Sequence, residues 1–242
     1  MSPDKGTLYI VSTPIGNLED ITLRALRILK EAELIAAEDT RQTQKLLSHY
    51  GIHTTLTSYH GYNKEEKAEI LLERLQKGQT IALVSDAGTP LISDPGLYLI
   101  NRCIQEGVPT VPVPGASAVL CALAVAGLPT DSFLFEGFLP RKKGKRLKTL
   151  ESLRSLPHTL IFFESPYRIR QTLKDCLEVL GDRPMVLARE LTKVFEEIIR
   201  GRITEVIERI SNGGVKGEVT LLIEGMSRKK NQSRELRSMS TR

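Results

Sequence analysis

Short apolar runs alternate with amphipathic stretches along the first half of the chain. The runs are rich in aliphatic and β-branched side chains, which is typical of buried strands. Five of them predict strands at residues 7–12, 34–37, 54–59, 80–84 and 110–113. Between the strands, apolar residues recur at helical spacing, as in residues 64–77 and 97–105. With a sixth strand at residues 133–138, this pattern predicts an α/β domain over residues 1–138.

The pattern changes after residue 138. Residues 139–147 are mostly basic, and we predict that they form a linker. Beyond the linker the pattern predicts strands at residues 160–163, 185–188 and 218–223. Together with intervening helices, these strands predict a second α/β domain over residues 148–225. Residues 226–242 are poor in apolar side chains and rich in Ser, Lys and Arg, so we predict a disordered basic tail.

The connection after the strand at residues 80–84 is long and rich in turn-forming residues. It contains the run Ser85-Asp86-Ala87-Gly88-Thr89-Pro90 and then Asp94-Pro95-Gly96. Glycine permits positive φ or a close backbone approach and proline fixes φ, so we expect a stiff loop. An ordinary connection here needs about two to six residues. Because ligands of open α/β sheets bind beyond the carboxyl ends of strands, we predict that this loop binds a ligand.

The formal charge of +5 is unevenly distributed along the chain. Residues 226–242 account for the whole excess, so the remainder is neutral overall. Within that remainder, six of the eight side chains at residues 141–148 are basic, and no acid occurs between Glu136 and Glu151. Such a run is either a solvated hinge or a surface that binds phosphates, and we give phosphate binding at least equal weight.

The sequence argues against several kinds of site and location. Cys103, Cys121 and Cys176 are far apart in apolar contexts, which predicts core thiols in a reducing compartment. The four histidines lack metal-ligand spacing, so we expect no metal. Neither a Rossmann nor a P-loop glycine pattern is present. There is no signal segment at the start, and the longest apolar stretch is too short for a membrane span, so we predict a cytoplasmic protein without membrane contact.

Six motifs occur in the order and spacing of one known family. They are Thr13-Pro14-Ile15-Gly16-Asn17-Leu18, Ala37-Glu38-Asp39-Thr40-Arg41, Ser85-Asp86-Ala87-Gly88-Thr89-Pro90, Phe135-Glu136-Gly137-Phe138-Leu139-Pro140, Glu164-Ser165-Pro166 and Ala188-Arg189-Glu190-Leu191-Thr192-Lys193. With these motifs, residues 7–225 resemble the ribosomal RNA small subunit methyltransferase I family of the tetrapyrrole methylase superfamily. The resemblance implies a two-domain α/β fold, each domain a sheet flanked by helices, with S-adenosylmethionine in the cleft between the domains. It also implies a homodimer that methylates the ribose 2′-oxygen of a decoding-centre cytidine in 16S rRNA, within the small ribosomal subunit.

The resemblance assigns candidate residues for the cofactor. In the first domain they are Pro14, Gly16, Asp86, Gly88, Thr89, Ser93, Pro114, Ala116 and Ser117. In the second domain they are Phe162, Glu164 and Leu191. Two positions depart from the family pattern, because Ala116 stands where proline is common and Phe195 where histidine is common. The second departure removes one candidate polar group near the cleft.

A ribose hydroxyl is a poor nucleophile at neutral pH, so a positioned base or a nearby cation should assist methyl transfer. Asp39, Glu190 and Lys193 are the candidates, and we favour Asp39 as base or orienter because it lies at a strand end. Capping of a helix by Asp39, with Arg41 in a surface ion pair, is an equally good interpretation. The candidates for binding RNA are Arg41, Arg141, Lys142, Lys143, Lys145, Arg146 and Arg189.

Two other functions stay open at this point. A small-molecule methylase acting on a tetrapyrrole-like ring would keep the fold but would need a large apolar mouth, whereas only 5% of the residues are aromatic. A non-catalytic RNA-binding protein would use the fold as a scaffold and bind RNA without modifying it. The basic run and the Asp86 loop together favour RNA methylation.

Overall fold

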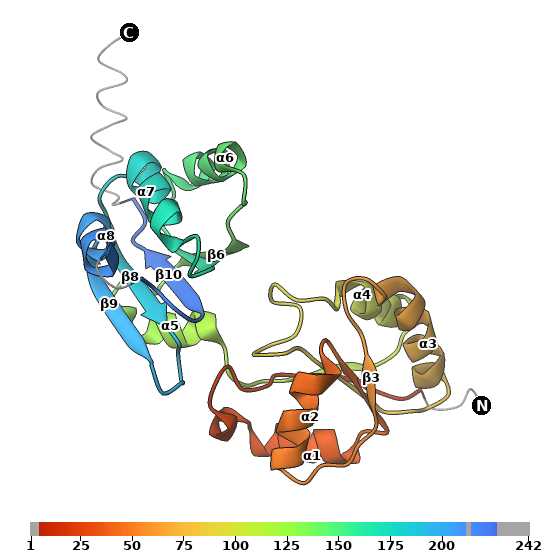
Figure 1. The fold of residues 1–242 in the computed structure, drawn as a ribbon. Helices are drawn as coiled ribbons and strands as arrows, with labels where there is room; N and C mark the ends of the chain where they lie inside the picture. Colours follow the sequence, from red (N-terminus) through yellow and green to blue (C-terminus); the bar gives the residue numbers. More distant parts are fainter. Residues whose placement is uncertain (1–4, 212–213, 227–242) are drawn as a thin grey trace. The chain divides into compact units, whose positions relative to one another are not determined.

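The chain folds into two compact units. The structure, a computed structural model, describes residues 5–211 and 214–226; the first unit ends at Ser117 and the second begins at Ala118 (Figure 1). Each unit is a sheet flanked by helices, as predicted. No helix of the described residues is long and apolar enough to cross a membrane.

The first unit contains a five-stranded sheet in which every neighbouring pair is parallel. Its strands, in the order β3-β2-β4-β1-β5, are β3 (Leu56–Ser58), β2 (Leu34–Ala37), β4 (Ile81–Val84), β1 (Leu8–Val11) and β5 (Thr110–Val113). The connecting helices are η1 (Leu18–Asp20), α1 (Leu23–Glu31), α2 (Thr40–His49), α3 (Lys64–Gln76) and α4 (Leu97–Gln105). The predicted strand and helix positions for this region are therefore confirmed to within a few residues.

Both faces of this sheet are buried. Along β2, Leu34 and Ala36 pack in a cluster with residues of α3 and α4, while Ile35 and Ala37 pack in a cluster with residues of α1 and α2. Successive strand residues point to opposite faces, so a run of four buried residues requires helices on both sides. Because all the strands are parallel, the loops at their carboxyl ends gather along one edge of the sheet.

The second unit is a mixed sheet covered by helices. Its strands, in the order β6-β7-β10-β8-β9, are β6 (Phe133–Phe138), β7 (Thr159–Glu164), β10 (Val219–Ile223), β8 (Pro184–Arg189) and β9 (Glu197–Arg202). Its helices are α5 (Ala118–Ala126), α6 (Lys143–Leu153), α7 (Ile169–Leu180) and α8 (Ile203–Ser211). The pair β6-β7 is parallel and the other pairs are antiparallel. One core cluster joins α6, α7 and α8 to one sheet face, and a second joins α5 to the other.

The predicted boundary at residue 138 is wrong. β6 pairs with β7 over residues 133–138 and 159–163, so it belongs to the second sheet, and α5 packs on that same sheet. The predicted linker at 139–147 is also wrong in part, because α6 begins at Lys143 within the basic run. Of the predicted tail, residues 227–242 lie outside the described part of the chain.

Candidate cofactor-binding and catalytic site

Loops at the carboxyl ends of β1, β4 and β5 are fastened to one another in the first unit. Thr13 and Gly88 form an antiparallel bridge, in which Thr13 N donates to Gly88 O at 2.9 Å and Gly88 N donates to Thr13 O at 3.1 Å. The hydroxyls of Ser12 and Thr89 lie 2.9 Å apart, and the Thr13 hydroxyl donates to Ser85 O at 3.2 Å. These bonds tie the loop after β4 to the end of the adjacent strand β1.

Two glycines allow the close approach of these loops. Gly88 has φ +79°, and a Cβ atom there would lie 3.3 Å from Ile15 Cγ2. A Cβ atom on Gly115 would lie 2.8 Å from Ser12 Cβ, closer than real Cβ contacts come. The β1, β4 and β5 loops therefore form one tight surface in which a side chain at either position would displace a neighbour.

The loop after β4 contains two further strained residues. Leu91 has φ 75° and Ser93 has φ 70°, values that non-glycine residues adopt rarely. Such conformations persist only where the surrounding structure imposes them, and they are common at ligand sites. The stiffness that the sequence predicts for this loop is thus visible as a constrained backbone.

The nine first-unit candidates for the cofactor all lie on these three loops. Gly16, Asp86, Ser93 and Pro114 are exposed. Thr89, Ala116 and Ser117 are half-buried, while Pro14 and Gly88 are buried and serve through their backbone or their packing. A ligand at this edge would therefore meet backbone amides and a few polar side chains, which can fix the orientation of a ligand through its polar groups.

Acidic side chains gather at the carboxyl ends of β2 and β4. Asp39 N donates to Asp86 Oδ1 at 2.9 Å, and Asp86 N lies 3.4 Å from Glu38 Oε2. Burial, followed by the charge of Asp94, raises the pKa of Glu38. Burial also raises the pKa of Asp86 and of Asp94. These three carboxyl groups are therefore better proton acceptors than ordinary surface carboxylates.

Asp39 differs from its acidic neighbours. Its carboxylate accepts hydrogen bonds from Arg41 Nη2 at 2.6 Å and from Arg41 Nε at 3.0 Å. Asp39 is also the N-cap of α2, where its carboxylate accepts a hydrogen bond from the Arg41 backbone N–H at 2.8 Å. The hydrogen bond from the Arg41 guanidinium lowers the pKa of Asp39 to about 2. A carboxylate that binds protons so weakly is a poor general base. The geometry supports Asp39 as an orienting residue. Asp39 also caps α2 and pairs with Arg41, which is the other interpretation that the sequence allowed.

In the second unit, Glu190 and Lys193 are engaged with each other. Lys193 Nζ lies 3.1 Å from Glu190 Oε1 and 3.0 Å from Glu218 Oε2. Glu190 Oε1 also accepts the Glu218 backbone N–H at 2.8 Å, which lowers the pKa of Glu190. Although burial lowers the pKa of Lys193, the two carboxylates outweigh it and the pKa is raised. Neither residue has the properties of a general base at neutral pH.

The loop that contains Glu190 is also constrained. Glu190 has φ 51° and Thr192 has φ 66°. A Cβ atom on Gly217 would lie 2.3 Å from Glu190 Cδ, so the Glu190 side chain occupies space that only glycine leaves free. Leu191, the cofactor candidate between the two strained residues, is half-buried.

Two other second-unit candidates are buried. The Phe162 side chain is 0% exposed within the core, and the Glu164 side chain is likewise 0% exposed. Glu164 accepts hydrogen bonds from the Thr172 hydroxyl at 2.5 Å and Ser165 N at 2.7 Å. These side chains stabilise the second unit from within, so the prediction that they contact the cofactor is wrong for the side chains of both residues.

The basic run at residues 141–148 divides into two groups. Arg141, Lys142, Lys143, Lys145 and Lys148 are exposed. Arg146 is buried beside Asp175, with a distance of 2.5 Å between Nη2 and Oδ2. The prediction that Arg146 binds RNA is therefore wrong, because its position on α6 turns it into the core while its neighbours face water.

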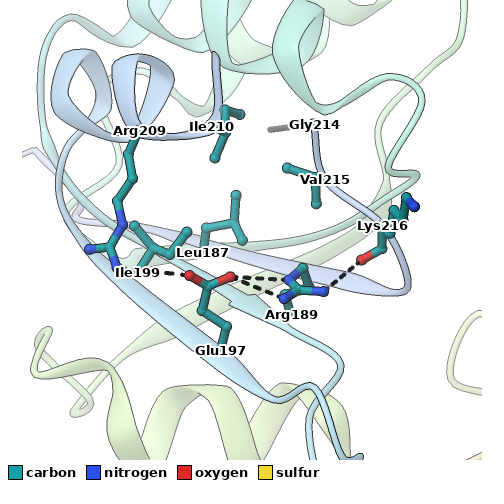
Figure 2. Close-up of a pocket in the computed structure, with 9 residues that line it drawn as sticks. All are labelled: Leu187, Arg189, Glu197, Ile199, Arg209, Ile210, Gly214, Val215 and Lys216. Atoms are coloured by element: carbon teal, nitrogen blue, oxygen red, sulfur yellow. Dashed lines mark hydrogen bonds and ion pairs between the residues drawn. The ribbon is translucent and has the colours of Figure 1, made fainter. Parts of the chain in front are cut away.

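Arg189 lines a pocket of about 370 Å³ formed by residues of β8, β9, α8 and the segment before β10. Figure 2 shows its guanidinium directed at Glu197, and both Nε and Nη2 lie 3.2 Å from Glu197 Oε2. Arg209 approaches the same carboxylate at 3.8 Å. Arg189 is thus already paired, whereas Arg41, which is highly exposed, keeps part of its guanidinium in solvent.

Sequence reasoning missed Glu38 and Asp94. Both lie within the motifs that were singled out, but their raised pKa arises from burial and from mutual proximity across β2 and β4, which no local pattern encodes. Among residues 5–211 and 214–226, no group of three or more His, Cys, Asp or Glu side chains is arranged to hold a metal ion.

Known proteins match this fold along most of the chain. A family model described as Tetrapyrrole (Corrin/Porphyrin) Methylases matches residues 7–207. The solved structure of diphthine synthase has a TM-score of 0.71 at 16% identity, covering 90% of each chain. That of a cobalt precorrin-4 methyltransferase has a TM-score of 0.65 at 21% identity, covering 90% of this chain and 94% of the other. Fold and loops define a protein of the tetrapyrrole methylase class.

Sequence relatives narrow this class. A protein of Halalkalibacterium halodurans named Ribosomal RNA small subunit methyltransferase I is 54% identical over 226 residues, covering 93% of this chain and 78% of the relative. Proteins of the same name from Escherichia coli O157:H7 and Thermotoga maritima are 51% and 47% identical, each covering 91% of this chain, with 78% and 99% of the relative covered. The chain belongs to the ribosomal RNA small subunit methyltransferase I family, as its motifs indicated.

Proposed function

We propose that this chain transfers a methyl group from S-adenosylmethionine to the ribose 2′-oxygen of a cytidine in the decoding centre of 16S rRNA. Two observations support the proposal. The loops after β1, β4 and β5 form one constrained surface, held by the Thr13–Gly88 bridge. The relatives that are 47–54% identical carry the name of a small-subunit rRNA methyltransferase.

The first-unit loops fit the methyl donor. Close approach at Gly88 and Gly115 leaves backbone groups, rather than side chains, at the loop surface. The exposed Asp86 and Ser93 would accept or donate hydrogen bonds to the polar groups of the donor. The sulfonium of S-adenosylmethionine supplies the activated methyl group, so the protein has to align donor and acceptor and exclude water. A stiff loop surface of this kind serves that purpose.

The acceptor oxygen must lose its proton as the methyl group arrives. Glu38 and Asp86, whose pKa values are raised, are better acceptors of that proton than Asp39, whose pKa is about 2. In this proposal Asp39 positions its neighbours, because its backbone N–H donates to Asp86 and its carboxylate holds Arg41. Arg41 is then oriented for an RNA phosphate. Glu190 and Lys193 hold the loop around Leu191.

The substrate side of the proposal rests on charge. The exposed cations Arg141, Lys142 and Lys145 have no ion-pair partner among the residues that the structure describes. Each phosphate that such side chains neutralise releases counterions, which favours RNA binding. The proposal includes the small ribosomal subunit as the substrate particle, a homodimer as the working form and the cytoplasm as the location.

Label transfer tests this proposal. The protein is incubated with methyl-labelled S-adenosylmethionine and small ribosomal subunits lacking modifications, and the RNA is then digested to nucleosides. Label in a single methylated cytidine of 16S rRNA is the expected result. Binding of the donor without label in RNA would favour a small-molecule methylase, and RNA binding without donor binding would favour a non-catalytic RNA-binding protein.

A further inference from the structure

Two loops of the second unit are fastened side by side at one edge of its sheet. They follow β6 and β7, which are parallel, so both leave the sheet at the same edge. Arg168, in the loop after β7, donates to Leu139 O at 2.7 Å in the loop after β6. Arg146 donates to Pro140 O at 3.0 Å and to Arg141 O at 2.9 Å. The two loops therefore behave as one surface, below α6 and α7 (Figure 1).

Tyr167 projects from this surface into solvent. It is 97% exposed, and it makes no hydrogen bond or ring contact within the described part of the chain. Its backbone is nevertheless held, because Arg168 N and Ile169 N both donate to Ser165 O, at 3.0 Å and 3.1 Å. A large ring in water on a rigid turn gains nothing for the fold, since it buries no surface.

The loop that is fastened to the Tyr167 loop leads into a cationic stretch. Arg141 directly follows Pro140, the residue held by Arg146, and Lys142 and Lys145 come next along the chain. All three are exposed, whereas Lys143 Nζ lies 3.8 Å from an exposed acid of the described region, Glu178. A further aromatic side chain, Phe138, is 58% exposed at the end of β6. Exposed rings among unpaired cations are the combination that binds single-stranded nucleic acid.

We propose that Tyr167 stacks on an unpaired base of the RNA substrate while Arg141 and Lys142 contact the adjoining phosphates. The inference rests on the proposed RNA substrate and adds a residue that positions it. Sequence-specific RNA recognition uses unstacked bases on aromatic rings, and stacking is tolerant of base identity. In this proposal Tyr167 is a positioning residue, because a ring that stacks on a base fixes where the RNA lies and takes no part in the methyl transfer.

Fluorescence provides a direct test, because the chain contains no tryptophan. In Tyr167→Trp the single indole reports on position 167, and a short single-stranded RNA of mixed sequence should quench its emission. Tyr62→Trp is the matched control, since Tyr62 is equally exposed but lies in the first unit, outside the basic run. Quenching at 167 and not at 62 supports stacking. Bound RNA without quenching at 167 overturns the inference while leaving the proposed methylation intact.

Kinetics on small ribosomal subunits provide the second readout. Tyr167→Ala should raise KM for the subunit about tenfold with kcat unchanged, and Tyr167→Phe should behave as wild type because it keeps the ring. The affinity of Tyr167→Ala should keep the wild-type salt dependence, since no phosphate contact is lost. An unchanged KM in Tyr167→Ala overturns the inference even if the short RNA fails to bind. Absence of methylation by the wild-type protein would instead overturn the proposed function, and the inference with it.

Discussion

Arg146 and Asp175 form a buried ion pair, with Nη2 and Oδ2 2.5 Å apart and the side chains 5% and 1% exposed. The same guanidinium donates to the backbone oxygens of Pro140 and Arg141. One buried side chain therefore connects α6 to α7 and shapes the loop that presents the exposed cations. A residue within the densest basic run of the sequence serves the core, and the cations beside it face solvent.

Replacing Arg146 should destabilise the protein. Arg146→Met leaves the Asp175 carboxylate buried without a positive charge beside it, with only the Gln171 amide still donating to Oδ1 at 2.9 Å among the described residues. We therefore expect the free energy of unfolding to fall by about 3–5 kcal/mol. Urea denaturation followed by circular dichroism measures this loss. Lys145→Met, an exposed neighbour, is the control and should change stability by less than about 0.5 kcal/mol. The double variant Arg146→Met/Asp175→Leu should lose less than Arg146→Met alone; equal losses would mean that the pair is not the cause.

Reversing the exposed charges should abolish RNA methylation. In Arg141→Glu/Lys142→Glu/Lys145→Glu we expect no transfer to small ribosomal subunits and unchanged affinity for S-adenosylmethionine, because the cations serve the RNA. If each cation meets one phosphate, the log–log salt dependence of RNA affinity should become shallower by about 2–3. Arg24→Glu/Lys30→Glu/Lys77→Glu reverses three exposed cations of the first unit and is the control. Undiminished methylation by the first variant would make the basic run a solvated surface.

The pKa of Asp39 should be far from that of Glu38. Carbon-13 NMR titration should show Asp39 ionised down to about pH 2 and Glu38 titrating above 4.5. Because the folded pKa of Asp39 lies below its unfolded value of 3.8, the Asp39–Arg41 pair stabilises the fold above that pH and ceases to do so as pH falls through about 2. Arg41→Gln should return the Asp39 pKa toward 3.8. If the pKa of Asp39 were near 4 with Arg41 present, Asp39 would again be a candidate for the general base.

A methyl group at Gly115 should weaken binding of the methyl donor. Gly115→Ala places Cβ 2.8 Å from Ser12 Cβ, so the loop after β5 has to move away from the end of β1. We expect calorimetry to show at least a tenfold loss of affinity for S-adenosylmethionine, with the overall fold retained. Gly61→Ala is the matched control in the same unit, because a Cβ atom there meets nothing within 4 Å. Equal affinities of the two variants would exclude these loops from the donor site.

Much of the fold could be predicted from the chain alone. The apolar runs at β2 and β4 are short and uninterrupted because interior strands of a parallel sheet are buried on both faces. The unit boundary could not be predicted in this way. β6 continues the alternation of strands and helices, and only its pairing with β7 assigns it to the second sheet. Periodicity identifies a strand but does not identify its partner.

The candidate site, like the fold, could be predicted only in part. The loops at Pro14, Asp86 and Pro114 could be identified from their turn residues and from the family motifs. The burial and pairing of the charged residues could not be predicted, because the sequence does not show that Arg146 is buried or that Arg189 is paired with Glu197. The low pKa of Asp39 likewise follows from hydrogen-bond geometry. The sequence shows which residues are charged, but only the fold shows which of these charges are free to contact a ligand.

The central claim is methylation of a ribose oxygen, and alkaline hydrolysis tests it most directly. Alkali cleaves RNA through attack by the 2′-oxygen, so a 2′-O-methyl group protects the phosphodiester that follows it. Small ribosomal subunits labelled by the protein and methyl-labelled S-adenosylmethionine should yield their label in one alkali-stable dinucleotide that begins with cytidine. Label recovered in a mononucleotide would place the methyl group on a base and contradict the account.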